Sequence, residues 1–493
     1  MAHGYRSGDR QQLFLLPPSM DEWLEEGHLA YFVIDTVKLI NTSAFHEIHP
    51  EGPGRPAYDP EMMLGLLLYA YATGVRSSRK IMAACRSDLA YKVIAVNLVP
   101  DHRTIARFRA ENEDEIKSVF VEVLNLCDAA GLASLGQIAI DGTKVGSDAA
   151  LDQNRGKDWI LAEINKILGD AAATDEAEDA SPPLFETQLP EWLRGRHGRL
   201  ERLQAALAEI EAQEKAVRDE QEAKAERARQ EAAQGRKLRG RKPKDPHAAL
   251  SRAEADLQAM QVRAETDPGV DIATAQQVVS QARAAAASAP PSSDKIVANI
   301  TDPESRIMKT KDGWIQGYNV QASVNVDQVV VGYETTQDHN DVNQLCSMIE
   351  ATQVAADAAG IESEIELALA DAGYWSEDNA TASGPNRLIA TTKDWKQRKA
   401  ARELGTTTGP PPADASVLEQ MEHRLRTPEG AAAYATRSHT VEPVFGDVKE
   451  NRGYRRFMRR GLEAADSEAG LIFAVHNLLK IFHHNPSVVF SPS

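Results

Sequence analysis

The sequence lacks the long apolar runs and the cysteine pairs that mark membrane proteins and small secreted proteins. It has no stretch of about 18 uninterrupted apolar residues, so we expect no transmembrane helix and no membrane partner. The N-terminal segment MAHGYRSGDRQQ has no apolar core, which argues against a secretory leader. Its three cysteines, Cys85, Cys127 and Cys346, are far apart, which excludes a CxxC metal knuckle, and their odd number does not suit a disulfide framework. We expect all three to be buried and inert in a reducing cytoplasm.

The chain also lacks an excess of positive charge. It has 55 Lys and Arg residues against 73 Asp and Glu residues, and its net charge is −18. DNA affinity comes largely from Lys and Arg side chains that neutralise phosphates, so this total weighs against a DNA partner. The charge is uneven, however: acidic residues gather at 175–179, and basic residues gather at 236–244 and 452–460. The total therefore does not exclude DNA binding by local basic segments.

Residues 1–132 predict an all-α N-terminal domain. Apolar and amphipathic segments indicate helices at 60–74, 75–85 and 88–97. Asp101 can cap a further helix, HRTIARFR (102–109), which carries Arg103 and Arg107 near its start. Short helices followed by one with a basic, capped N-terminus are typical of a helix-turn-helix, whose second helix binds in the major groove of DNA. A plain helical bundle with a solvated basic face is the alternative.

Residues 150–296 predict a helical insertion. They are rich in Ala, Glu, Gln and Arg. Five apolar residues recur on one helical face: Leu200, Leu203, Leu207, Ile210 and Val217. Glu214 interrupts this seam, so the coiled-coil pattern is imperfect. A second helical stretch at 248–265 follows the turn GRKLRGRKPKDP, which indicates an antiparallel hairpin with a basic tip. Arg239 and Arg241 in that tip suit a narrow minor groove or phosphate contacts, and a merely solubilising tip is the alternative.

The flanking segments, 133–149 and 297–485, predict a mixed α/β sheet. GQIAIDGTKVG (136–146) alternates like a strand, and GYNVQASVNVDQVVVGYETT (317–336) alternates like a hairpin. Helices and two further short strands follow in alternation. The resulting order of strand, hairpin, helix, strand, helix, strand and helix matches an RNase H-like core, which the helical insertion interrupts.

Two aspartates stand at the ends of predicted strands. Asp141 ends the first strand, and Asp371 ends a later one in LADAGYW. Ligands bind at strand ends in open α/β sheets, so the two carboxylates converge if their strands are neighbours. A pair of carboxylates supplies the oxygen ligands that Mg²⁺ prefers. Either aspartate alone is equally compatible with ordinary turn chemistry.

A third carboxylate comes from the segment YATRSHTVEPVFGDVKENRG (434–453). Glu442, Gly446 and Lys449 lie at i, i+4 and i+7, which predicts one shared helical face with an apolar face behind it. Pro443 suits a first helical turn, so we expect Glu442 near the helix N-terminus, where the helix dipole favours its charge. A surface helix with solvated charges is the alternative.

The same segment resembles the Y-R-E-K signature of bacterial insertion-sequence transposases with a DDE catalytic triad. The residues that correspond to it are Tyr434, Arg437, Glu442 and Lys449. The spacing from Glu442 to Lys449 is that of the family, whereas four residues separate Arg437 from Glu442 where the commonest form has three. IAIDGTKV, ADAGYWS, TDPESRIMKTKDGWIQGYNVQ and PDHRTIARFR also resemble segments of these enzymes, so the resemblance covers most of the chain outside 150–296.

This resemblance implies a DNA transposase that cleaves the ends of its element and transfers the strands into target DNA. Asp141, Asp371 and Glu442 would hold two Mg²⁺ ions, with Mn²⁺ as an alternative, and would be the catalytic residues. Lys449, Arg437 and Tyr434 would grip the DNA backbone near the cut, and Arg455 and Arg456 would line the DNA path. The implied partners are double-stranded DNA, as terminal inverted repeats and target, and a second copy in a synaptic homodimer. The implied place is the bacterial cytoplasm, at the nucleoid.

Three other functions remain open at this stage. An RNase H-like nuclease that cuts without joining would have the same carboxylates. A non-catalytic DNA-binding protein derived from a transposase would share the framework, although the presence of all three carboxylates argues against it. A structural coiled-coil protein fits 198–266 and does not fit the β-core.

Overall fold

The structure is a computed structural model that describes residues 19–47, 57–179, 191–235, 243–265, 267, 269–289, 296–394 and 405–484. The chain forms two compact units, one of residues 1–148 and 307–493 and the other of residues 149–306. Arg239 and Arg241 lie outside the described residues, so their predicted roles stay predictions. None of the helices in the described ranges has the length and apolar character needed to cross a membrane.

The N-terminal part of the first unit is helical, as predicted. Its elements are η1 (Met20–Glu22), α1 (Leu29–Val37), α2 (Ser43–Glu47), α3 (Pro60–Ala72), α4 (Ser78–Ser87), α5 (Leu89–Ile94), α6 (His102–Glu111) and α7 (Glu113–Ala129). Helix α3 is buried along most of its length, which explains its unbroken apolar sequence. Asp101 caps α6 by accepting a hydrogen bond from the backbone N–H of Arg103 at 2.9 Å.

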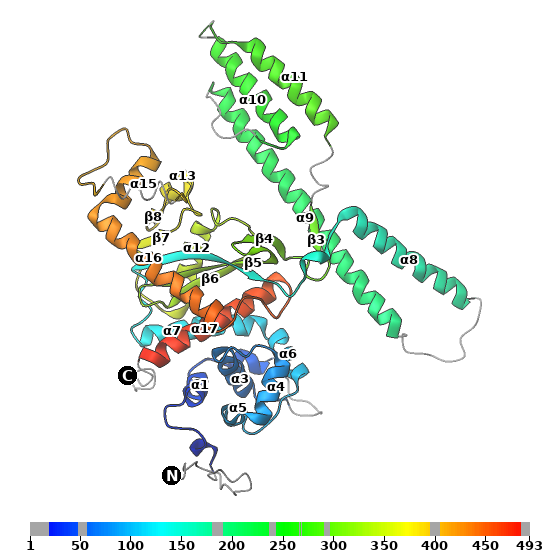
Figure 1. Ribbon diagram of the computed structural model, residues 1–493, viewed down its shortest axis with the longest axis vertical. Helices are drawn as coiled ribbons and strands as arrows, with labels where there is room; N and C mark the ends of the chain where they lie inside the picture. The colour runs from blue at the N-terminus through cyan, green and yellow to red at the C-terminus, as the bar shows by residue number, and fades with distance from the viewer. Residues whose placement is uncertain are drawn as a thin grey trace, which may run out of the picture. The chain divides into compact units, whose positions relative to one another are not determined.

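The rest of this unit is built on one six-stranded sheet (Figure 1). Its strands are β1 (Gln137–Gly146), β4 (Arg306–Thr310), β5 (Gly313–Asn325), β6 (Val330–Thr336), β7 (Leu367–Ala370) and β8 (Asn386–Ile389). The order is β4-β5-β1-β7-β8, and β6 pairs with β5. Strand β5 is antiparallel to β1 and β6, whereas β1, β7 and β8 are parallel. The mixed sheet is confirmed; β4, at its edge, was not predicted.

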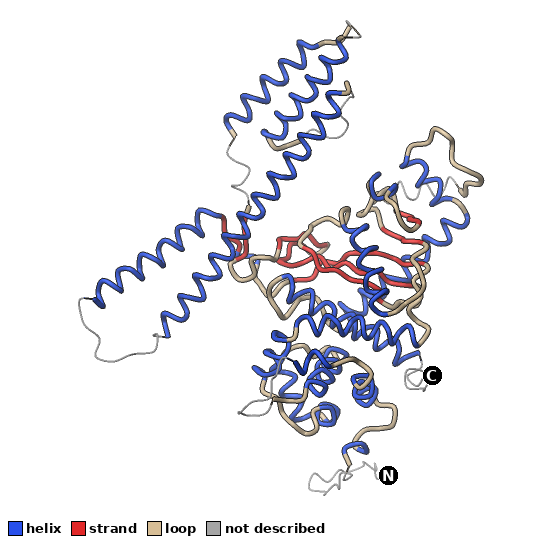
Figure 2. The backbone as a smooth tube through the Cα atoms, turned by 180° about the vertical axis from the view of Figure 1, so that it is seen from behind, coloured by secondary structure: helices blue, strands red, loops and turns tan. Residues whose placement is uncertain are grey.

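Helices cover both faces of the sheet. Helix α12 (Gln344–Ala359) packs on one face, where Thr352 shares a hydrogen bond with Ser323 of β5. Helix α17 (Leu462–His484) packs on the other face, where Phe473 contacts the ring of Tyr333. Helices α7 and α17 run side by side beneath the sheet in Figure 1. Figure 2 shows the strands of this unit gathered between helices.

Three further helices complete the unit: α13 (Glu377–Thr381), α15 (Val417–Arg426) and α16 (Pro428–Gly446). The π-helical turn η4 (Asp447–Asn451) continues directly from α16. Ser416 and Glu419 form a capping box at the start of α15. Helix α16 lies against β1, β5 and β7, so it runs over the sheet at the ends of the two strands that carry the aspartates.

The second unit is largely helical. It contains η2 (Leu151–Gln153), β2 (Asn154–Gly156), α8 (Lys157–Asp179), α9 (Glu191–Ala233), α10 (Pro246–Ala264), α11 (Ile272–Ser288) and β3 (Val297–Asn299). Strands β2 and β3 form a small antiparallel sheet. Leu203 and Ile210 of the predicted seam are buried against α8, and Glu214 pairs with Lys157 at 2.8 Å. The predicted hairpin corresponds to α9 and α10, whereas α8 and α11 were not predicted.

One prediction about the cysteines is wrong. Cys85 and Cys127 are buried, but Cys346 is exposed. Its position in the first turn of α12 explains the difference, because the buried side of that turn is formed by Gln344 and Leu345.

Candidate active site

Asp141 and Asp371 occupy neighbouring positions where the parallel pairing of β1 with β7 ends. The register of β1 and β7 places Ile140 beside Ala370, and each aspartate is the next residue along its strand. Each carboxylate accepts a hydrogen bond from the backbone N–H of a nearby glycine: Gly142 to Asp141 at 2.9 Å, and Gly373 to Asp371 at 2.6 Å. The predicted convergence of the two aspartates is therefore present in the fold. The prediction that Asp141 ends its strand is wrong, because β1 continues to Gly146 while paired with β5, whereas Asp371 directly follows β7.

Glu442 comes to these strand ends on α16. The helix is anchored by buried Val441, Val444 and Phe445, and the Glu442 side chain is 60% exposed. Its position in the helix differs from our expectation. Helix α16 begins at Pro428, capped by Thr427, so Glu442 lies near the C-terminal end.

Pro443 is tolerated inside α16 because its missing N–H is replaced. A proline leaves the carbonyl four residues earlier without its helical donor, and here that carbonyl belongs to His439. The side-chain amide of Gln328, in the turn between β5 and β6, donates to His439 O at 2.8 Å. The placement of Glu442 at a helix N-terminus was therefore wrong, and the helix dipole does not favour its charge.

All three carboxylates line one cavity of about 340 Å³. Its lining residues are Asp141, Asp371, Ala372, Ala390, Thr392, Lys393, Tyr434, Arg437 and Glu442. The cavity thus gathers residues from β1, from the ends of β7 and β8, and from α16. Five of the residues predicted from the sequence lie in it. The Tyr434 hydroxyl also donates a hydrogen bond to Ala370 O at 3.3 Å.

Arg437 lies between two of the three carboxylates. Its Nη2 is 2.8 Å from Oδ2 of Asp141, and its Nη1 is 3.7 Å from Oε1 of Glu442. The Arg437 side chain is only 11% exposed, so water screens these ion pairs weakly. The Arg437 guanidinium thus offsets part of the negative charge of Asp141 and Glu442.

The electrostatic state of Asp141 is unusual. The pKa of Asp141 is raised to about 6, chiefly by burial and to a smaller extent by the nearby carboxylates of Asp371 and Asp341, against the lowering effects of Arg437 and the Gly142 N–H. Acidic side chains that raise one another's pKa are typical of sites that bind cations. The set of three carboxylates suits Mg²⁺ or Mn²⁺, which prefer oxygen ligands. Within the described ranges, however, no three acidic, His or Cys side chains stand close enough together to hold a metal ion as they are placed.

Lys449 does not line this cavity, among the residues described. Its Nζ donates to the backbone carbonyl of Lys144 in β1 at 2.7 Å. Burial lowers the pKa of Lys449 to about 8. The face that Lys449 was expected to share with Glu442 is interrupted, because α16 ends at Gly446 and the wider π-helical turn follows.

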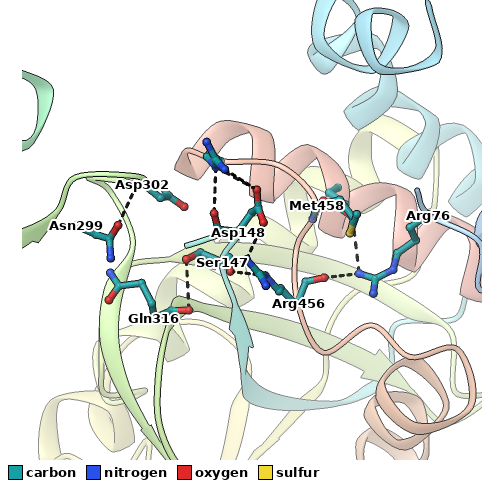
Figure 3. A network of polar contacts seen from close by, with 10 residues as sticks. Arg76, Ser147, Asp148, Asn299, Asp302, Gln316, Arg456 and Met458 are labelled. Carbon is teal, nitrogen blue, oxygen red and sulfur yellow. Dashed lines mark hydrogen bonds and ion pairs between the residues drawn. The ribbon is translucent and has the colours of Figure 1, made fainter. Parts of the chain in front are cut away.

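The arginines that follow η4 make ion pairs and backbone contacts within the first unit. Arg455 pairs with Glu450. Arg456 pairs with Asp148 at 2.7 Å and donates to Ser147 O at 3.0 Å, and Figure 3 shows this contact beside the end of β1. Arg456 and Asp148 are partly exposed, so phosphate could compete for this arginine.

The basic residues predicted on α6 differ in their surroundings. Arg103 and Arg107 are both exposed, and Arg107 lies 3.9 Å from Glu111 one turn later. Arg109 on the same helix is buried, where it donates to the Tyr71 hydroxyl and to Arg76 O. Arg103 and Arg107 are thus exposed on the surface of α6, whereas Arg109 links α6 to Tyr71 of α3 and to the segment that follows it.

Sequence reasoning missed several residues around the site: Lys144, Asn319, Gln321, Asp341, Tyr374 and Lys393. Lys393 lines the cavity after β8. Asn319 and Gln321 are completely buried in β5. Asn319, Gln321, Ser323 and Asn325 alternate with apolar residues and form a buried polar face of β5. Buried polar side chains need partners, so this alternation could have indicated a polar cluster on that face.

Two parts of the chain match family models. Residues 18–111 match a model described as a transposase domain (DUF772), and residues 391–482 match a model described as a transposase DDE domain. The second match contains Tyr434, Arg437, Glu442 and Lys449. No curated protein and no solved structure matches the chain.

Proposed function

We propose that this chain, an insertion-sequence DDE transposase by both of its domain matches, cleaves DNA at the ends of its element and joins those ends to target DNA. The resemblance seen in the sequence is confirmed by these matches, and the chemistry is the proposal. The observation that carries it is the cavity where Asp141, Asp371 and Glu442 meet. We further propose that the sheet is an RNase H-like core, a proposal that its parallel β1, β7 and β8 beside antiparallel β5 and β6 support.

The catalytic residues in this proposal are Asp141, Asp371 and Glu442. Their carboxylates would bind two Mg²⁺ ions, or Mn²⁺ in their place, which supply Lewis-acid activation of the attacking oxygen and stabilisation of the leaving oxygen when bound. The chain's own contribution is to position the reacting groups in line and to offset the charge of the phosphate. Water is the nucleophile in cleavage, and a DNA 3′-hydroxyl is the nucleophile in strand transfer.

Cationic side chains at the cavity would hold the DNA backbone. Arg437 can make a bidentate phosphate contact, and Lys393 a point-charge contact, from within the lining. Tyr434 offers a hydroxyl at the same place. Lys449 lies outside the cavity lining. Its hydrogen bond to the backbone carbonyl of Lys144 supports β1, the strand that carries Asp141.

The remaining DNA contacts are proposed for exposed basic residues. Arg103 and Arg107 on α6 suit a groove or phosphate contact by the helical N-terminal region. Arg455 and Arg456 flank the site and would exchange their acidic partners for phosphates. Two DNA ends must be held together, so we propose a homodimer in the synaptic complex, acting at the nucleoid in the cytoplasm.

The test is a metal-dependent nicking assay on the DNA that flanks the coding region. Glu442→Gln should abolish cleavage while end binding stays within about twofold of the unaltered chain. Glu429→Gln, a matched change at an exposed residue in the first turn of the same helix, should cleave normally. Retained cleavage by Glu442→Gln would overturn the assignment.

A nuclease that cuts without joining is the main rival function. It would process the flanking DNA but would fail to insert precut ends with free 3′-hydroxyls into a target plasmid. Strand transfer of such ends therefore separates the two. A protein without catalytic activity would show neither reaction with either metal.

A further inference from the structure

The carboxylate of Asp341 lies behind the candidate active site. Asp341 belongs to the loop between β6 and α12, and its side chain is 24% exposed. Its Oδ1 accepts from three side chains: Nδ2 of Asn319 at 2.8 Å, Nε2 of Gln321 at 2.9 Å and Nζ of Lys144 at 3.3 Å. These donors come from β5 and β1, so the loop is fastened to two strands at once.

This cluster is on the sheet face opposite to Asp141. Gly142 pairs with Gln321 across the two strands, and Asp141 pairs with Ala322. Because successive residues of a strand point to opposite faces, Gln321 and Asp141 face opposite ways. Asp341 therefore contacts β1 and β5 on the face of the sheet where α12 packs, opposite to the face that carries Asp141.

Two glycines give Asp341 close access to the turns that present the aspartates. A Cβ on Gly142 would lie 2.7 Å from Oδ1 of Asp341 and 2.3 Å from Nε2 of Gln321. A Cβ on Gly373 would lie 3.4 Å from Oδ2 of Asp341 and 2.8 Å from Oδ1 of Asp371. The Asp341 carboxylate thus approaches Gly142 so closely that a side chain there would collide with it, whereas at Gly373 the collision would be with Asp371 and the distance to Asp341 is an ordinary contact.

A second connection runs through Tyr374. Its buried hydroxyl donates to Oε1 of Gln321, and its backbone N–H donates to Asp371 O at 3.1 Å. Gln321 in turn donates to Asp341. The turn that follows β7 is therefore tied to Asp341 by a continuous chain of hydrogen bonds.

Asn319 provides an independent sign that this cluster has a role beyond stability. Asn319 is completely buried, and its Oδ1 has no hydrogen-bond partner among the described residues. That oxygen would lie 3.1 Å from a Cβ on Gly142, beside Oδ1 of Asp341. Nearly all buried polar atoms in folded proteins have a hydrogen-bond partner, so an acceptor left without one marks a cluster that is not arranged for stability alone.

We propose that Asp341 is a positioning residue of the transposase site, which sets the backbone beside Asp141 and Asp371 and strengthens divalent-cation binding from the far face of the sheet. This inference rests on the proposed function. Groups that orient metal ligands typically change metal affinity by 10–100-fold when altered, although they touch no metal themselves.

The test measures Mn²⁺ affinity of the full-length chain by electron paramagnetic resonance. Asp341→Asn, which keeps the shape of the side chain, should weaken Mn²⁺ binding by about 10–100-fold. Asp338→Asn is the matched control: Asp338 lies in the same loop, is exposed, and accepts from Gln344 at 2.7 Å. It should bind Mn²⁺ within about twofold of the unaltered chain. The thermal unfolding midpoint of each variant reports whether the fold is kept.

A second variant keeps the test informative if Asp341→Asn unfolds. Tyr374→Phe removes the donor to Gln321 and leaves Asp341 in place, and it should also weaken Mn²⁺ binding severalfold. Folded variants of both kinds that bind Mn²⁺ like the unaltered chain would overturn the inference, as would equal weakening in Asp338→Asn.

Two reference variants distinguish a wrong role for Asp341 from a wrong assignment of the metal site. Asp141→Asn and Asp371→Asn should lose Mn²⁺ binding whether or not Asp341 positions them. If they bind Mn²⁺ normally, the proposed site is wrong. If they lose it and Asp341→Asn does not, only the role of Asp341 is wrong.

Discussion

Replacement of Arg437 by glutamine should have opposite effects on metal binding at low and at high pH. In the metal-free site, the guanidinium lies 2.8 Å from Asp141 and 3.7 Å from Glu442, in the space that a cation would share. It lowers the pKa of Asp141, which burial holds at about 6. Arg437→Gln therefore removes a competitor for the carboxylates and also makes Asp141 harder to ionise.

The size of both effects follows from the ion pair. Two unit charges about 4 Å apart attract by about 4 kcal/mol at an effective dielectric constant of 20, which is an upper value for a site open to water. An opposite charge at this range typically lowers a carboxyl pKa by about 1–3 units, so Arg437→Gln should raise the pKa of Asp141 by that amount. Above the new pKa, Mn²⁺ should bind tighter than in the unaltered chain.

The assay is the Mn²⁺ dissociation constant measured from pH 5 to pH 9. Binding needs ionised carboxylates, so affinity falls as pH drops through the pKa of Asp141. The curve for Arg437→Gln should be displaced to higher pH and reach tighter binding at its alkaline end, whereas Arg437→Lys, which keeps the charge, should stay near the unaltered curve. A glutamine variant with an undisplaced curve and weaker binding throughout would refute the competition between guanidinium and metal.

Three further predictions concern single residues. The pKa of Asp141 is higher in the folded state (about 6) than in the unfolded chain, so ionisation of its carboxyl destabilises the metal-free fold as pH rises from about 4 through 6. Asp141→Asn should therefore stabilise the metal-free fold at pH 8 by up to about 3 kcal/mol, measured by urea unfolding, and should give no such gain near pH 3. Gly142→Ala would place a Cβ 2.3 Å from Nε2 of Gln321, so it should destabilise the fold by about 1–3 kcal/mol, whereas Gly156→Ala, with open space around it, should show no comparable overpacking cost. Arg103→Ala should weaken binding to element-end DNA and reduce the slope of log affinity against log salt by about 1, and an unchanged slope would remove Arg103 from the phosphate contacts.

The sequence was sufficient to predict the parts of the site that rest on local patterns. Alternation located β1 and the hairpin of β5 and β6, and the cap at Asp101 located α6, because these elements depend on neighbours in the chain. The meeting of Asp141 with Asp371 was also predictable, because each directly follows an apolar run in the sequence, although the continuation of β1 to Gly146 was not. The resemblance to DDE transposases directed attention to Glu442.

Other parts of the site depend on contacts that no local pattern contains. Pro443 suggested a helix start, but Gln328 supplies the missing donor from a turn more than 100 residues away. The π-helical turn after Gly446 carried Lys449 out of the face expected from a regular helix. Asp341 stands in a polar stretch that no local pattern distinguishes, and its contacts appear only when β1, β5 and the loop before α12 are brought together.

The central claim is that Asp141, Asp371 and Glu442 act as one unit. It is tested most directly by the cleavage rates of Asp141→Asn, Asp371→Asn, Glu442→Gln and the triple variant on the same element-end DNA with Mg²⁺. Groups that work as a unit are strongly non-additive, so each single variant should be as inactive as the triple variant. Losses that multiply from single to triple, or substantial cleavage by any single variant, would contradict the claim.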